Sequence, residues 1–86
     1  MKLSLPYNFL DMMTVADLKP GEKALITGFS TPEFSLQLME MGCTPGEAIF
    51  MERYAPMGDP VAISIDGYLL SLRKKEATTI LVKKME

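Results

Sequence analysis

The segment Ala55-Pro56-Met57-Gly58-Asp59-Pro60 decides how the rest of the chain is interpreted, because it separates two stretches with the composition of β-strands. Residues 47–54 before it are rich in strand-forming side chains, and residues 61–66 after it alternate apolar with small or polar ones. Its two prolines lack the N–H that a strand ladder needs, and its Gly-Asp pair favours a tight turn. We therefore predict a stiff, non-helical connection between two strands of a hairpin.

A second turn follows this hairpin. The dipeptide Asp66-Gly67 has the sequence of a two-residue type I′ hairpin turn. Across this turn Ile65 would pair with Tyr68, which predicts that Tyr68 and alternate residues after it face inward. A short helical turn is predicted over residues 74–78, and a last strand over residues 80–82.

The residues before the first hairpin predict one strand and one helix. Residues 22–29 have the composition of a strand, and Thr31-Pro32-Glu33 is typical of a helix start. The helix should run to about Met41 and end at Gly42, which takes a left-handed conformation readily. The Pro45-Gly46 turn then returns the chain to the sheet.

The predicted helix has an apolar side chain on its outer face. At 100° per residue, Leu38 points toward the core, Leu36 points away from it, and Met39 lies on the flank. An outward leucine is often an isolated surface residue, and the alternative is that it anchors a partner protein. Both interpretations stay open at this point.

These elements together predict a mainly β fold. Five short strands with tight turns and one inserted α-helix are typical of a small, partly open barrel of the SH3-like kind, and an OB-like barrel is the alternative. We expect residues 1–13 to form a loosely ordered N-terminal arm, residues 14–83 the folded domain, and residues 84–86 a frayed tail. The pattern leaves open which face of residues 47–54 is buried.

Composition limits the class of protein. A chain of 86 residues with 48% apolar side chains is expected to form one small domain. The net charge of −2 gives no general attraction to nucleic acid or to an anionic membrane. Polar residues and a proline interrupt the apolar residues of 1–13, and no continuous apolar run reaches the ~18 residues that span a bilayer. A single cysteine indicates a reducing compartment. We therefore expect a cytoplasmic protein.

The inventory of reactive side chains does not support an enzyme. The chain has no histidine, which is the commonest general base and a common metal ligand. Cys43 has no histidine to activate it as a nucleophile. The eight methionines follow no repeated spacing, so they are better explained as adaptable core filler than as ligands of a soft metal. We predict no catalysis, no cofactor and no bound metal.

Several separate motifs occur in an order that resembles the FeoA family. They are Met41-Gly42-Cys43-Thr44-Pro45-Gly46, residues 53–60 (RYAPMGDP), Gly67, and residues 72–77 (LRKKEA). The resemblance covers residues 14–82. It implies an SH3-like domain related to the C-terminal domain of iron-dependent repressors. It also implies a cytoplasmic accessory protein of ferrous iron transport, which acts by contact with FeoB, a membrane ferrous iron transporter that has a cytoplasmic GTPase domain.

Two groups of residues follow from this interpretation. The residues predicted to contact the partner are exposed apolar or cationic side chains: Leu36, Met39, Met57, Arg73, Lys74 and Lys75. The residues expected to shape turns are Gly42, Pro45, Gly46, Pro56, Gly58, Asp59, Pro60, Asp66 and Gly67.

Other interpretations remain beside this one. The three cations could instead form an ordinary solvated face or lie near the anionic inner leaflet. We expect contact with the membrane only through the partner, and no contact with nucleic acid. A homo-oligomer remains possible. The alternative function is a divalent-metal-sensing regulatory domain related to the repressors.

Overall fold

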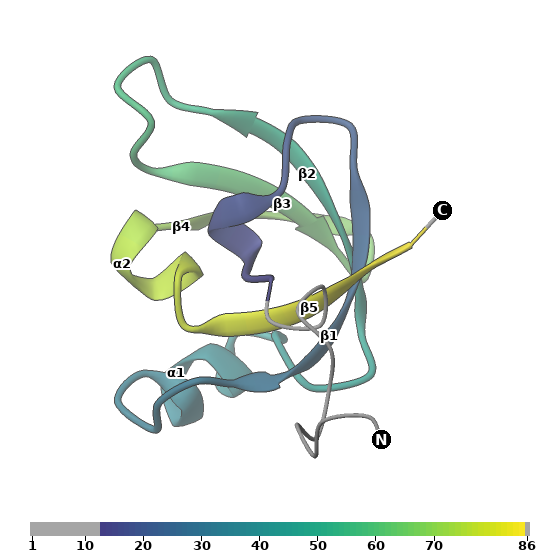
Figure 1. Cartoon of the computed structure of the whole chain (residues 1–86), viewed down its shortest axis with the longest axis vertical. Helices are drawn as coiled ribbons and strands as arrows, with labels where there is room; N and C mark the ends of the chain where they lie inside the picture. The colour runs from purple at the N-terminus through teal and green to yellow at the C-terminus, as the bar shows by residue number, and fades with distance from the viewer. Residues whose placement is uncertain (1–12, 86) are drawn as a thin grey trace, which may run out of the picture.

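The computed structural model describes residues 13–85, which form an antiparallel sheet of five strands in the order β4-β3-β2-β1-β5. The strands are β1 (Lys23–Phe29), β2 (Ala48–Tyr54), β3 (Val61–Ile65), β4 (Tyr68–Leu72) and β5 (Ile80–Met85). A 3-10 turn, η2 (Val15–Asp17), and two short helices, α1 (Ser35–Glu40) and α2 (Lys74–Ala77), complete the described part. The sheet is strongly curved, but its edges β4 and β5 do not pair (Figure 1). The predicted mainly β, partly open architecture is therefore confirmed.

Two parts of the chain lie outside this description. Of the predicted N-terminal arm, residues 1–13, only Met13 is described. Glu86, the last residue of the predicted tail, also lies outside the described residues.

The core lies inside the curve of the sheet. The alternation in β3 buries Val61, Ile63 and Ile65, as the sequence pattern predicted. Opposite them Ile49 and Met51 of β2 are buried, which settles the face that the sequence left open. The register then shifts between Met51 and Arg53. A bulge of this kind changes the face that successive side chains occupy, which explains why neither face of the strand was cleanly polar.

The second hairpin turn forms as predicted, but the strand after it begins differently. Asp66 and Gly67 both have positive φ angles, 50° and 86°, as a type I′ turn requires. Ile65 pairs with Tyr68 as predicted, so the two side chains lie on the same face of the sheet, but Tyr68 is 45% exposed rather than buried. The ring lies at the edge of the sheet, where no further strand covers it, and its hydroxyl donates to the carbonyl of Met41 at 2.8 Å.

Two predicted boundaries also change. The helix expected over residues 32–41 is shorter, because residues 32–34 form a turn in which the Ser35 amide bonds to the Pro32 carbonyl at 3.2 Å. The last strand is longer than the predicted 80–82. Residues 83–85 pair with β1 rather than fraying.

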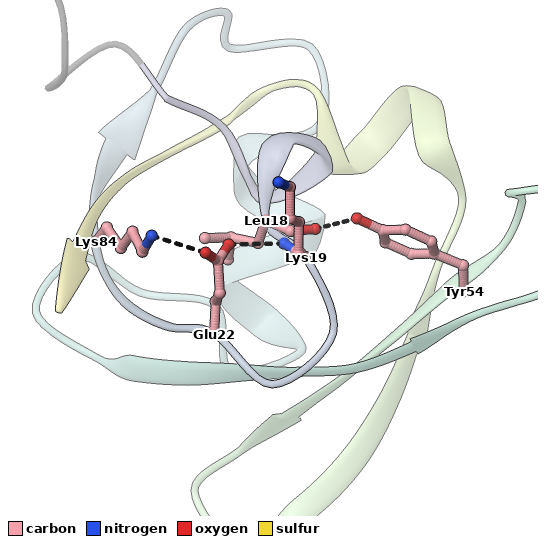
Figure 2. Close-up of polar contacts among 5 residues, drawn as sticks. All are labelled: Leu18, Lys19, Glu22, Tyr54 and Lys84. Carbon is pink, nitrogen blue, oxygen red and sulfur yellow. Dashed lines mark hydrogen bonds and ion pairs between the residues drawn. The ribbon is translucent and has the colours of Figure 1, made fainter. Parts of the chain in front are cut away.

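A small group of polar contacts holds the beginning and the end of this sheet together (Figure 2). One carboxylate oxygen of Glu22 accepts a hydrogen bond from the Lys19 amide at 2.8 Å. The other lies 2.7 Å from the Lys84 ammonium nitrogen on β5. Beside them, the Tyr54 hydroxyl of β2 donates to the carbonyl of Leu18. These contacts join the turn before β1 to β2 and β5.

We expect acid to weaken the fold partly through Glu22. The hydrogen bond from the Lys19 amide and the nearby Lys84 ammonium lower the pKa of this carboxyl below its usual value. A carboxyl whose pKa is lower in the folded than in the unfolded chain adds stability above its unfolded pKa. That contribution is lost as the pH falls through the folded pKa. Glu22→Gln should therefore flatten the acid side of a plot of Tm against pH, measured by circular dichroism.

The control for this experiment is Glu33→Gln. The side chain of Glu33 has no hydrogen bond or ion pair among residues 13–85. The acid side of its curve should match that of the wild type. An unchanged curve for Glu22→Gln would contradict the prediction.

Candidate functional site

The candidate surface is built from three connections outside the sheet: α1, the loop 55–60, and the start of α2. The loop joins β2 to β3, as predicted, and is closed by a hydrogen bond from the Ala55 amide to the Pro60 carbonyl at 2.9 Å. Its tip carries Met57, whose side chain is 91% exposed. An apolar side chain held this far into solvent on a closed loop is suited to contact another molecule.

The loop is attached to α2 by one hydrogen bond that the sequence did not predict. The sequence predicted only that Asp59 shapes its own turn. Its carboxylate instead accepts from the amide of Lys74 at 2.9 Å. A carboxylate at this position satisfies an amide that the first turn of a helix leaves without a partner. The loop and α2 are therefore fixed relative to each other.

On α1 the predicted inward and outward faces are confirmed. Leu38 is fully buried, whereas the side chains of Leu36 and Met39 are 67% and 37% exposed. The helix ends at Glu40 with Met41 as its C-cap, and Gly42 follows with a φ angle of +105°. Two half-buried side chains of this segment, Phe34 and Met41, pack against the core. One apolar side of α1 thus faces the core while another faces solvent.

The three predicted cations are exposed at the start of α2. The ammonium nitrogen of Lys75 lies 5.9 Å from the centre of the Phe34 ring, close enough for a cation–π interaction. Within residues 13–85 none of Arg73, Lys74 and Lys75 forms a salt bridge. Their charges are therefore available for an acidic partner surface.

A shallow hollow of about 600 Å³ lies where these three connections meet. It is lined by Gln37, Met41, Asp59, Pro60, Ser71, Arg73 and Glu76. The structure thus brings Arg73 of the predicted set to this hollow, while Leu36 and Met57 do not line it. Met39 lines a different hollow of about 350 Å³ beside the end of β1. Gln37 was missed by the sequence analysis, because a polar residue on a helix flank is an ordinary feature of a solvated face.

Cys43 takes no part in this surface. Its side chain is fully buried, and burial raises the pKa of the thiol to about 11. A neutral, inaccessible thiol is unreactive, so Cys43 serves as a small apolar residue of the core.

The described residues show neither a metal centre nor a membrane span. Between residues 13 and 85, no three His, Cys, Asp or Glu side chains lie close enough together to hold a metal ion. In the same part of the chain, no helix has the length and apolar character needed to cross a bilayer.

Solved structures define the class of this fold. The FeoA-like protein of Clostridium acetobutylicum has a TM-score of 0.81 and 36% sequence identity, over 86% of this chain and 87% of that one. FeoA of Stenotrophomonas maltophilia in complex with zinc, an SH3 domain protein, has a TM-score of 0.72 and 24% identity, over 83% of this chain and 89% of that one. The chain is thus a small SH3-like β-domain, and its connections carry the exposed side chains of Leu36, Met57 and Arg73.

The family follows from the sequence match. The family model for the FeoA domain matches residues 13–84. The Fe(2+) transport protein A/Fe(2+) transporter FeoB fusion protein of Porphyromonas gingivalis is 33% identical over 72 residues, which is 83% of this chain but 8% of the fusion protein. The chain belongs to the FeoA family, which is involved in ferrous iron transport.

Proposed function

We propose that this protein is a non-catalytic accessory protein of ferrous iron transport, which binds a FeoB-like transporter at the cytoplasmic side of the membrane. The observation that carries the proposal is the fusion relative, in which a region similar to this chain is joined to a Fe(2+) transporter FeoB. Domains that act together are often held together by fusion, because a covalent link gives them a high effective concentration. Where the two proteins are not fused, a binding surface must hold them together instead of the covalent link.

The surface around α1 has the composition such contact requires. Leu36, Met39 and Met57 are apolar anchors that protrude from the protein. The Lys74 amide bonds to Asp59 of the loop that carries Met57, and the Lys75 ammonium lies 5.9 Å from the Phe34 ring before α1, so the cations at the start of α2 lie between the loop and α1. In protein interfaces a few central apolar side chains provide most of the affinity, and surrounding charges speed association and set orientation. The transporter should therefore present an apolar groove with acidic residues at its rim.

A binding experiment with the purified cytoplasmic part of FeoB tests this proposal. Leu36→Asp and Met39→Asp should each weaken binding by about tenfold or more, because each places a charge in an apolar contact. Affinity is measured by calorimetry or by surface plasmon resonance, and circular dichroism confirms that the variants fold.

The matched control is Met85→Asp. Met85 and Met39 are methionines of similar exposure, 41% and 37%, but Met85 lies at the end of β5. The control should bind as the wild type does. If Leu36→Asp binds like the wild type, or if Met85→Asp is equally weakened, the proposed surface is wrong.

A further inference from the structure

The two edges of the sheet differ in how they are protected. At β5 the amide of Val82 donates to the carbonyl of Met13 at 2.9 Å, and Thr14 forms a bridge with Leu81. Beyond these contacts the strand carries the exposed lysines Lys83 and Lys84. A covering segment and charged side chains both prevent an edge strand from pairing with another chain.

Within residues 13–85 the β4 edge has none of these features. Residues 68–72, with the sequence YLLSL, contain no charge and no proline. Their register against β3 runs without a shift, so no bulge turns the strand away. An uncharged, regular edge strand is a template for pairing with another strand.

The backbone groups that this edge offers follow from the hairpin. In a two-residue hairpin the residues that flank the turn, here Ile65 and Tyr68, exchange hydrogen bonds across the strands. Alternation along β4 then directs the N–H and C=O groups of Leu69 and Ser71 away from β3. Among residues 13–85 no backbone hydrogen bond reaches these two residues from the open side. Both side chains are exposed as well.

We propose that β4 pairs in antiparallel fashion with β4 of a second copy of this chain, about a twofold axis through Leu70. In this register Leu69 of each copy lies opposite Ser71 of the other. Both residues of each pair have their N–H and C=O groups pointing outward, so each pair exchanges both of its hydrogen bonds. The two sheets join into one continuous sheet.

Charge favours a second copy over an unrelated strand. Just beyond the two ends of the paired strands, the same register brings Asp66, in the hairpin turn of one copy, toward Lys74, at the start of α2 in the other. Both side chains are exposed, and the pairing brings opposite charges together at both ends of the contact. The inference goes beyond the transporter contact. Lys74 belongs to both surfaces, and Ser71 lines the hollow beside the transporter surface. The tests therefore measure self-association of the purified protein, without the transporter.

Sedimentation velocity over a range of protein concentrations tests the association. The wild type should shift from the mass of one chain, 9.6 kDa, toward twice that mass as its concentration rises. Ser71→Pro removes one of the outward N–H groups and should sediment as a monomer. Ser71→Ala keeps the N–H and should behave as the wild type. A wild type that stays monomeric at all concentrations, or a folded Ser71→Pro that still dimerises, would overturn the proposal.

Cross-linking tests the register and does not depend on the proline variant. At Leu70 the two Cα atoms would lie about 4.5 Å apart, within the range of a disulfide. Leu70→Cys, treated with oxidised glutathione, should give a covalent dimer. Leu69→Cys should not, because its diagonal separation of about 7–8 Å is too long. The buried thiol of Cys43 should not react in either variant. Cross-linking of Leu69→Cys alone, or pairing of β4 only with an added extended peptide, would overturn the twofold pairing.

Discussion

Leu38→Ala is expected to lower the free energy of unfolding by about 2–5 kcal/mol, the usual cost of removing a fully buried leucine side chain. The full cost is expected because Leu38 is the one buried residue of α1 and its side chain lies wholly inside the core. Its carbonyl also accepts from the Cys43 amide at 2.9 Å, where the chain leaves the helix. A single core in a domain of this size gives only about 3–5 kcal/mol, so the variant should be largely unfolded. Urea denaturation followed by circular dichroism measures the loss.

Leu36→Ala is the control on the same helix. The Leu36 side chain is 67% exposed, so its truncation should change the free energy of unfolding by less than about 0.5 kcal/mol. Equal destabilisation by the two substitutions would contradict the assignment of inward and outward faces to α1. The comparison also separates effects on folding from effects on transporter binding, because Leu36 should contribute to binding and little to the stability of the fold.

Gly42→Ala is expected to cost about 1–3 kcal/mol of stability for two reasons. The residue has a φ angle of +105°, which a side chain disfavours. A Cβ atom at this position would also clash with the hydroxyl oxygen of Tyr68, which is held in place by its hydrogen bond to the Met41 carbonyl. The loss is measured by denaturation, as for Leu38→Ala.

Two further variants separate these causes. Gly21 has a similar φ angle, +94°, but a Cβ atom there would meet nothing within 4 Å, so Gly21→Ala reports the backbone cost alone. Adding Tyr68→Phe to Gly42→Ala removes the oxygen and should restore part of the lost stability. If Gly21→Ala and Gly42→Ala cost the same, and Tyr68→Phe restores nothing, the steric contact with Tyr68 does not contribute.

The hairpins could be predicted from the sequence because local chemistry determines them. Alternation over residues 61–65 and the Asp66-Gly67 dipeptide fix the strands, the turn and the register within a few residues. The face of β2 could not be predicted in this way. The bulge after Met51 breaks the two-residue period on which the argument rests, and a bulge depends on the partner strand as well as on local sequence.

Contacts between residues far apart in the sequence could not be predicted. Lys84 on β5 pairs with Glu22, and Asp59 bonds to the amide of Lys74, yet a charge or a turn residue does not by itself select its partner. The exposed side chains Leu36 and Met57 were predicted correctly as exposed, since helix periodicity and the loop composition determine that much. Whether they bind a partner depends on a second molecule, and this stays a prediction.

Most of the buried side chains of residues 13–85 lie on the sheet, whereas the side chains proposed to meet the transporter are exposed on α1, on the loop 55–60 or at the start of α2. Substitutions of these exposed side chains leave the interior largely untouched, so they should be tolerated readily. During evolution the contact residues can therefore change to match a different transporter while the fold stays the same. The same division makes the domain a convenient starting point for engineering altered partner preference.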